Sequence, residues 1–181
     1  MGAVLPNVET LARLLVATEA GSDDLAWPTI EREWETVFPA DYKEFLDLFG
    51  AGDFGDYLGV MAPFPQDHEA YKAGMRMVRL DSDMLEELDC PFPPYPAGGG
   101  VIAFGATPNG DSLLYRTAQQ PEDWRIVTWS RAGGRWTEHE HGFVDFVLAL
   151  LHAQLEKNPF GGRDLWGTEI TSYRHWNQPR H

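Results

Sequence analysis

Apolar residues near the N-terminus recur with the spacing of a helix that buries one face. They are Val8, Leu11, Leu14 and Leu15. The pattern ends near Gly21, and residues 21–24 are polar, as in a linker. We therefore expect a short N-terminal helix that packs on the domain as an appendage, followed by the linker and a further helical stretch over residues 28–36.

The strongest helical pattern covers residues 38–49. Its apolar side chains, three and four residues apart, are Tyr42, Phe45, Leu46 and Phe49. Pro39 suits the first turn because proline has no N–H group that would lack a partner there. Asp41 and Glu44 lie near the positive end of the helix dipole. The segment is expected to form a helix that packs inward and stops at Gly50.

Beyond this helix, a short apolar run is followed by polar and irregular segments. Residues 57–61 are apolar and lie between glycine and proline, which predicts a strand. Residues 66–88 are polar and are expected to be mostly helical, with a second helix capped near Asp81. Residues 91–100 contain four prolines and three glycines. That composition predicts a loop.

Two hairpins are predicted next, because residues that favour tight turns separate apolar strands. The paired strands are 101–107 with 112–117, around Asn109-Gly110, and 124–130 with 135–139, around Gly133-Gly134. Both faces of the strand 124–130 carry apolar side chains, which favours an interior position in a sheet. A last helix is expected over residues 143–154, followed by a tail that lies over the domain and buries its aromatic residues.

The charge of the chain narrows the class of partner. The sequence contains 14 lysines and arginines and 28 aspartates and glutamates, which gives a net charge of −14. This field repels phosphate backbones and anionic lipids, so nucleic acid and membrane are not expected as partners, whereas a basic protein would be attracted. Cys90 is the lone cysteine, and the N-terminus lacks the features of an export signal. We expect a cytoplasmic protein of one domain.

Two patterns raise the alternative of a hydrolase. Gly110-Asp111-Ser112-Leu113 resembles the nucleophile block of the GDSL hydrolases, but that family draws its base from an Asp-x-x-His, which this sequence lacks. His139 and His141 lie two residues apart at a predicted strand end, so they could point the same way and share a metal. The sequence marks no third ligand. A hydrolase that uses Ser112 or a His139–His141 metal site is kept as an alternative, while no catalytic residue, metal or cofactor is expected.

The order of the segments resembles a known family. Phe-Pro-Ala-Asp-Tyr-Lys-Glu-Phe-Leu at 38–46 is similar to the Leu-Pro-x-Asp-Tyr-Lys-x-Phe-Leu signature of the SUKH superfamily, also called Smi/Knr-like. In that family the signature opens a helix that leads into a Gly-rich turn and a strand. The Asn-Gly-Asp turn at 109–111 and the Phe-x-x-Phe at 143–146 follow in the family's order. The resemblance covers about residues 27–152.

The resemblance implies an α+β fold in a single domain, with a mainly antiparallel sheet of about five to six strands flanked by helices. It divides the chain into an N-terminal helix and linker (1–24), the family domain (25–155) and a C-terminal tail that packs on the domain (156–181). Bacterial members act as immunity proteins that bind and neutralise a toxin, frequently a nuclease. Fungal relatives act in cell-wall regulation.

By this resemblance we expect a non-catalytic protein that neutralises a basic toxin domain, with a regulatory scaffold as the alternative. The positions that match fold-specifying residues of the family are Pro39, Tyr42, Phe45, Gly110 and Asp111. An acidic rim that meets the toxin is expected at loops and sheet ends. Its candidate residues are Asp53, Asp56, Glu138 and Glu140.

Overall fold

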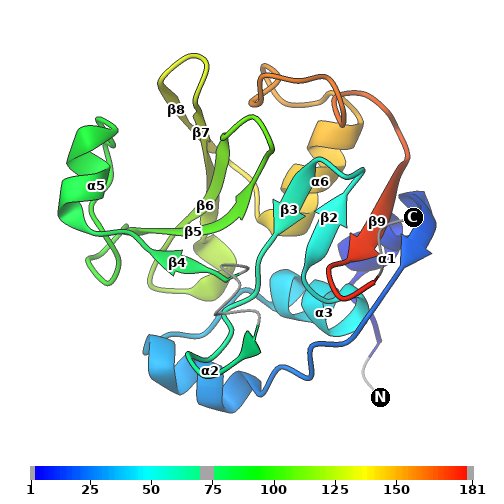
Figure 1. The fold of residues 1–181 in the computed structure, drawn as a ribbon, viewed down its shortest axis with the longest axis horizontal. Helices are drawn as coiled ribbons and strands as arrows, with labels where there is room; N and C mark the ends of the chain where they lie inside the picture. The colour runs from blue at the N-terminus through cyan, green and yellow to red at the C-terminus, as the bar shows by residue number, and fades with distance from the viewer. Residues whose placement is uncertain (1–2, 70–75, 179–181) are drawn as a thin grey trace.

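Nine strands form one mixed sheet in the computed structural model, which describes residues 3–69 and 76–178 (Figure 1). The strands are β1 (Leu15–Glu19), β2 (Gly52–Phe54), β3 (Leu58–Val60), β4 (Val78–Arg79), β5 (Val101–Ala106), β6 (Ser112–Arg116), β7 (Arg125–Ser130), β8 (Arg135–His139) and β9 (Thr171–His175). The helices are α1 (Pro6–Leu14), α2 (Trp27–Trp34), α3 (Ala40–Phe49), α5 (Ser82–Glu87) and α6 (Phe143–Leu151), with a 3-10 turn η1 (Pro121–Asp123).

The strands follow the order β1-β9-β2-β3-β5-β6-β7-β8, and β4 pairs with β5. Neighbouring strands run antiparallel except β1 and β9, which are parallel. The α+β class and the mainly antiparallel sheet are therefore confirmed. The expected number of five to six strands is too small, because both ends of the chain and the short segments β2 and β4 also contribute strands to the sheet.

The N-terminal helix is shorter than the apolar pattern predicts. It ends at Leu14, and residues 15–19 form β1 instead of a last helical turn. Four apolar positions in eight residues fit a short helix well, but the pattern cannot show that the following Leu-Val-Ala-Thr-Glu segment pairs with a strand at the other end of the chain. The same limit applies to the C-terminal segment. There, buried and half-buried residues alternate along β9, although its polar composition hides the period of two.

The inner face of the sheet is covered by α1, α2, α3 and α6, which share one apolar core with it. Tyr42 and Phe45 of α3 are fully buried in this core. The Tyr42 ring makes edge contacts with Phe104 and Tyr115 of the sheet and with Phe143 of α6. Pro39 is buried at the residue before α3. The 38–49 pattern thus correctly predicts an inward-packed helix, α3.

The two acidic residues of the 38–46 segment bond to the starts of two other helices. Asp41 Oδ2 accepts a hydrogen bond from the Val144 N–H at 3.0 Å, in the first turn of α6. Glu44 accepts one from the Leu5 N–H at 2.7 Å, just before α1. Burial raises the pKa of Asp41 from its ordinary value, and the backbone bonds oppose that rise. The first N–H groups of a helix have no partner within that helix. By accepting hydrogen bonds from N–H groups at or just before the starts of α6 and α1, the two carboxylates of α3 fix the positions of both helices relative to α3.

The outer face of the sheet is covered over β5 to β8 by α5 and the loop after it. Leu85 of α5 packs against Val101, Leu114 and Val127. The Trp136 Nε1–H donates to the Leu88 carbonyl at 2.8 Å. As predicted, α5 is capped by Asp81, whose side chain accepts from the Met84 N–H.

The polar region 66–88 is not as helical as expected. Val78–Arg79 forms β4 rather than part of a helix, because these residues pair with β5. The prediction for residues 70–75 lies outside the described residues. Within the described ranges, no helix has both the length and the apolar character to cross a bilayer.

Both hairpins are confirmed, and so is the last helix, although it ends at Leu151 rather than at residue 154. β5 pairs with β6 across the Asn109-Gly110 turn, and β7 lies between β6 and β8. Gly110 has φ +85°. Asp111 is 1% exposed, and it accepts hydrogen bonds from the Arg131 and Gly161 N–H groups at 3.0 and 3.3 Å. The turn therefore also anchors the loop after β7 and the segment after α6.

Candidate functional site

One row of residues crosses the outer face from edge to edge of the sheet. Residues that pair directly across neighbouring strands point to the same face. Read through the strand registers, the row is Glu19, Arg174, Asp53, Gly59, Ala106, Ser112, Trp129 and Trp136. The residues of the row are charged on β1, β9 and β2, small on β3, β5 and β6, and aromatic on β7 and β8. The aromatic end belongs to the cluster under α5.

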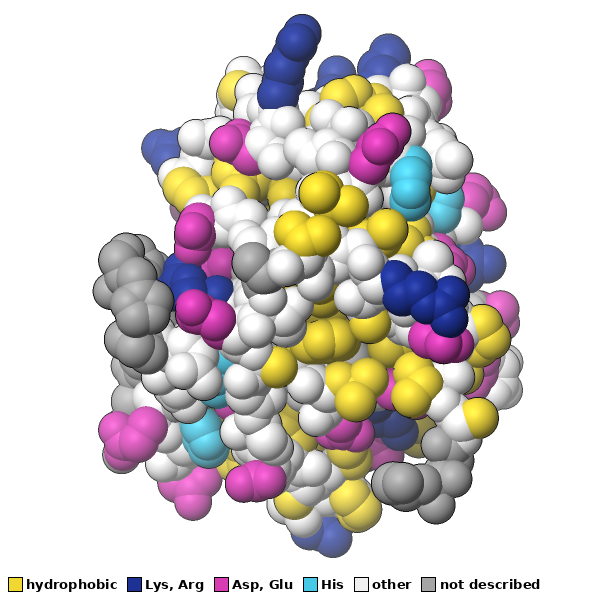
Figure 2. All heavy atoms as spheres, turned by 90° about the vertical axis from the view of Figure 1, so that its right-hand side faces the viewer, with side chains coloured by type: hydrophobic (Ala, Val, Ile, Leu, Met, Phe, Trp, Pro, Cys, Tyr) yellow, Lys and Arg dark blue, Asp and Glu magenta, His cyan; other side chains and the backbone are white. Residues whose placement is uncertain are grey.

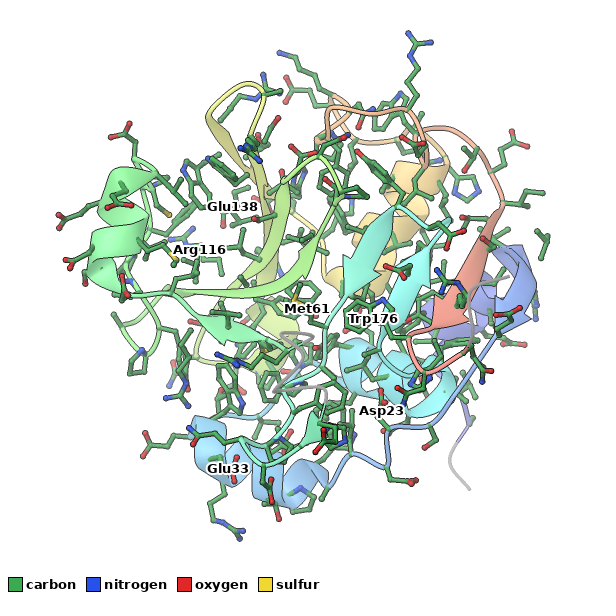
Figure 3. All side chains as sticks on the ribbon, viewed as in Figure 1. Asp23, Glu33, Met61, Arg116, Glu138 and Trp176 are labelled. Atoms are coloured by element: carbon green, nitrogen blue, oxygen red, sulfur yellow. The ribbon has the colours of Figure 1, made fainter. Side chains whose placement is uncertain are left out.

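The charged part of the row, together with Gly59 and Ala106, lines a hollow of about 760 Å³, which we call the outer groove. Figure 3 shows Trp176 and Met61 beside β2 and β3, whereas Arg116 and Glu138 lie beside β6 and β7. The lining residues with charged, aromatic or flexible side chains include Glu19, Asp53, Asp56, Met61, Arg174 and Trp176. The groove lies on the half of the outer face away from α5.

Arg174 organises the acidic side of the groove. Its guanidinium forms an ion pair with Asp56 and lies 3.6 Å from Asp53 Oδ2. The pKa of Arg174 is raised, first by the hydrogen bond to Asp56 and then by the charges of the nearby carboxylates. The Arg174 side chain is 16% exposed, while that of Asp56 is 74% exposed. Asp56 thus carries its charge into solvent at the mouth of the groove.

Trp176 lies over β3 because Gly59 has no side chain. Its Nε1–H donates to Asp53 Oδ2 at 2.8 Å. A Cβ atom at Gly59 would lie only 3.2 Å from the Trp176 ring, a distance at which the ring would have to shift. The indole is therefore held by one hydrogen bond and by the flat surface of the strand, and it remains half-buried with part of the ring accessible.

The groove offers charged and aromatic binding groups. Among the described residues that line it, the carboxylates of Glu19, Asp53 and Asp56 face the guanidinium of Arg174. Carboxylates and an indole ring are the groups that proteins use to hold a cationic side chain. The arrangement suits recognition of a basic partner.

The four predicted rim residues do not form one surface. Asp53 and Asp56 lie together at the outer groove. Glu138 lies near the end of β8 and Glu140 just beyond it, and four strands separate β8 from β2. Glu138 accepts two hydrogen bonds from Arg116 Nη1, at 2.8 and 2.9 Å. Its charge is therefore neutralised within the molecule.

Ser112 on β6 is far from His139, which lies two strands away on β8. Ser112 pairs with Trp129 on β7, whereas His139 on β8 pairs with Ile126 of β7. Three residues along a strand span about 10 Å, and the strand β7 lies between Ser112 and His139. The hydrogen-bond partner of His139 Nε2 is the Thr128 hydroxyl, at 3.0 Å. Nothing in this arrangement activates Ser112 as a nucleophile.

His139 and His141 border a separate hollow of about 360 Å³ between β8 and the loop after α6. Burial, and next the charge of His141, lower the pKa of His139 to about 4, while Glu138 acts in the opposite direction. Nδ1 of His141 is buried without a hydrogen-bond partner. In the part of the chain that the structure describes, no group of three or more histidine, cysteine, aspartate or glutamate side chains could hold a metal ion. The two histidines therefore lack a third ligand there.

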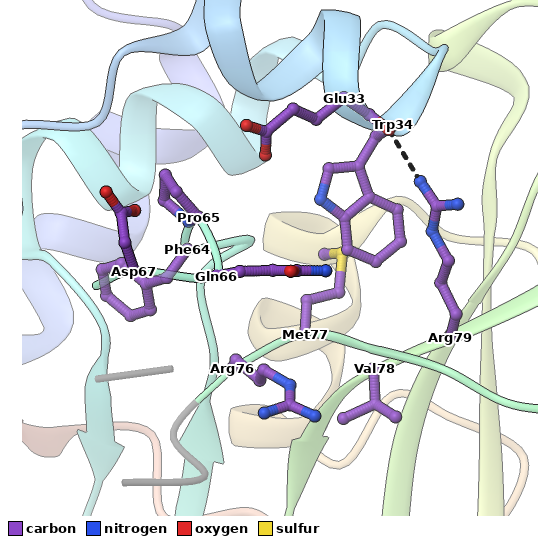
Figure 4. Close-up of a pocket in the computed structure, with 10 residues that line it drawn as sticks. All are labelled: Glu33, Trp34, Phe64, Pro65, Gln66, Asp67, Arg76, Met77, Val78 and Arg79. Carbon is purple, nitrogen blue, oxygen red and sulfur yellow. Dashed lines mark hydrogen bonds between the residues drawn. The ribbon is translucent and has the colours of Figure 1, made fainter. Parts of the chain in front are cut away.

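A third hollow, of about 710 Å³, lies between α2 and β4 (Figure 4). Arg79 stacks on the Trp34 ring at 4.5 Å and donates to the Glu33 carbonyl at 2.9 Å. Phe64 and Met77 add apolar walls. Arg79 is thus occupied by contacts within the chain.

Sequence reasoning missed the residues that complete the outer groove. Glu19, Arg174 and Trp176 lie on segments predicted to be a helix, a linker or a tail. The signal that could have found β9 is its alternation of Thr171, Tyr173 and His175 with more polar neighbours. No local pattern shows that this strand lies between β1 and β2.

Searches of characterised proteins and of solved structures found no match to the chain. A comparison with protein families did find one. The model of the SMI1 / KNR4 family (SUKH-1) matches residues 23–149, which include α2, α3, both hairpins and most of α6. The matched region covers well over half of the chain and agrees with the order of elements described above. The chain belongs to the SMI1 / KNR4 family (SUKH-1).

Proposed function

We propose that this chain is a non-catalytic immunity protein that binds and neutralises a basic toxin domain, such as a nuclease, in the cytoplasm. The observation that carries the proposal is the outer groove, which three carboxylates and a half-buried indole line in a protein of net charge −14. Membership in the SUKH-1 family supports an immunity-type role.

Neutralisation would follow from occlusion. A toxin that acts on a nucleic acid carries basic residues around its active site, because it must bind phosphates. An acidic protein that covers those residues blocks the substrate. Long-range attraction between opposite charges also speeds the encounter, and that attraction weakens as salt screens it. The mechanism requires one molecule of this protein for each toxin molecule and no turnover.

The proposal is tested by isolating the partner and then measuring protection. The tagged chain is used to recover its tightest-binding protein from the native cell, and that protein is expressed alone and together with the chain. We expect the partner to be a basic domain that arrests growth when alone and is harmless at equimolar expression of the chain. A non-toxic partner, such as a stable cell-envelope protein, would instead support the regulatory scaffold. Turnover of a substrate that is lost in Ser112→Ala would support the hydrolase.

A further inference from the structure

We infer that the outer groove binds an arginine-bearing segment of the partner protein, and that the C-terminal strand β9 and Trp176 supply the contacts that select it. This inference rests on the proposed function in one respect, that the partner is a protein with a basic surface. It goes further by naming the surface and the chemistry of the segment.

The charge of the groove favours a cation. Among the residues that the structure describes, its lining holds the carboxylates of Glu19, Asp53 and Asp56 and one guanidinium, that of Arg174. Arg174 cancels part of this charge, but the Asp56 carboxylate remains largely in solvent, where a second guanidinium can approach it. An anionic segment would meet two more negative than positive charges at the same place.

The aromatic wall favours arginine over lysine. The Asp53 carboxylate accepts the Trp176 Nε1–H at 2.8 Å, which fixes the plane of the indole. A planar guanidinium stacks on such a ring and can form two parallel hydrogen bonds to a carboxylate, whereas an ammonium group does neither as well. Trp176 and Asp56 border the same hollow, so one arginine could use both.

The floor of the groove is shaped to receive a chain. Gly59 and Ala106 line the groove and pair across β3 and β5. Ser112, which pairs with Ala106, continues this strip of small residues onto β6. Three neighbouring strands at about 4.8 Å spacing make the strip roughly 10 Å across. That width suits one extended segment or the tip of a loop. Larger side chains border it, with Trp129 and Trp136 on one side and Arg174 and Trp176 on the other.

The groove is built from two parts of the sequence. Asp53, Asp56 and the small floor residues lie within the matched family region, residues 23–149. Glu19, Arg174 and Trp176 lie outside that region, on β1 and at the C-terminal end. The family domain thus supplies the floor and two carboxylates, and the terminal segments of this chain add the stacking ring and the charge pattern around it. Residues of this second part are the ones expected to distinguish one partner from another.

The inference is tested with the full chain and a defined probe. The probe is a short blocked peptide of alternating glycine and arginine, compared with equivalent lysine and glutamate peptides. Binding is followed by NMR through the indole N–H signal of Trp176, assigned by its loss in Trp176→Phe. We expect a saturable shift of this signal and of the Gly59 and Ala106 amide signals, strongest with the arginine peptide and absent with the glutamate peptide.

Variants separate a specific site from general charge attraction. Asp56→Asn and Trp176→Phe are each expected to lower the affinity for the arginine peptide about fivefold. Glu122→Gln removes the same charge at the exposed η1 turn, and it should leave the affinity unchanged. An equal loss of affinity for the arginine peptide in all three variants overturns the inference. So does the absence of a saturable shift in the groove at millimolar peptide, or a shift confined to the β1 edge around Val16.

The isolated toxin then distinguishes this inference from the proposed function. In one outcome, the unaltered chain neutralises the toxin, and the variants Asp56→Asn and Trp176→Phe both bind the toxin as tightly as the unaltered chain does. The groove is then not the docking surface, although the proposed function stands. If the arginine peptide binds in the groove and the chain protects against no toxin, the surface stands and the proposed function fails. Weaker toxin binding in both variants, but not in Glu122→Gln, supports the two together.

Discussion

Asp23 and His175 are 152 residues apart in the sequence and hydrogen-bonded in the structure, with 2.9 Å between Asp23 Oδ1 and His175 Nε2. Their side chains are 4% and 3% exposed. The other oxygen of Asp23 accepts the Ala51 N–H at 2.7 Å, at the start of β2. One carboxylate therefore joins the segment after β1, the start of β2 and the end of β9.

We predict that His175→Ala lowers the free energy of unfolding by about 3 kcal/mol, because it empties a buried site and removes a hydrogen bond from the buried Asp23 carboxylate. Urea denaturation measures the change. Amide exchange should become faster in β1 and β9 before the rest of the sheet. His152→Ala is the matched control, since His152 is exposed at the end of α6. Equal losses in both variants would contradict a specific role for the pair.

Tyr173 provides a test of whether the C-terminal segment is part of the folded core. Its ring is fully buried and packs on Phe45 and Phe54, and its hydroxyl donates to the Gly50 carbonyl at 2.6 Å. We predict that the free energy of unfolding falls by about 4 kcal/mol in Tyr173→Ala and by about 1 kcal/mol in Tyr173→Phe. Denaturation curves measure both changes. A dispensable tail would show almost no change in either variant.

Asp111 is expected to matter for stability rather than for binding. Replacement by alanine leaves the Arg131 and Gly161 N–H groups and the Thr107 hydroxyl without their acceptor. We predict a loss of about 3 kcal/mol in Asp111→Ala. Asn109→Ala changes an exposed residue of the same turn, and it should cost less than about 1 kcal/mol. Thermal unfolding of the two variants provides the comparison, and similar melting temperatures would refute the assigned role.

His139 predicts a defined pH dependence of stability. Its pKa is about 4 in the folded chain, against an ordinary value of about 6.5 in the unfolded chain. Between these values the unfolded chain binds the proton and the folded chain does not, so stability falls as the pH decreases from 6.5 to about 4. The shift corresponds to a loss of up to about 3 kcal/mol across that range.

The carboxylates also titrate in this range, so the His139 contribution is read as a difference. The free energy of unfolding is measured from pH 7 to 4 in the unaltered chain and in His139→Gln. The gap between the two should narrow or reverse toward low pH, as the unaltered chain loses the stability that the variant cannot lose. A gap that stays constant with pH would contradict the lowered pKa.

The elements that the sequence predicts well are those set by local chemistry. Pro39 and the apolar spacing from Tyr42 to Phe49 identify α3 without knowledge of its neighbours. Asn109-Gly110 likewise identifies the turn between β5 and β6. In each case, the residues that determine the element lie within it, so a short window contains the necessary information.

The elements that it predicts poorly depend on distant partners. β1 and β9 are short and polar or mixed in composition, and each is stabilised by the other. Asp23 looks like a linker residue until His175 is placed beside it. The candidate site has the same property. Asp53 and Asp56 could be proposed from a Gly-rich loop, but Arg174 and Trp176 become part of the site only when the sheet is assembled.

The place of β9 in the sheet determines when the protein can be completed during synthesis. β1 is made before β9, yet its only strand partner among the described residues is β9, which lies between β1 and β2. Until β9 has left the ribosome, the nascent β1 strand therefore lacks this partner. A truncation that removes β9 would likewise remove the bridge between the two parts of the sheet.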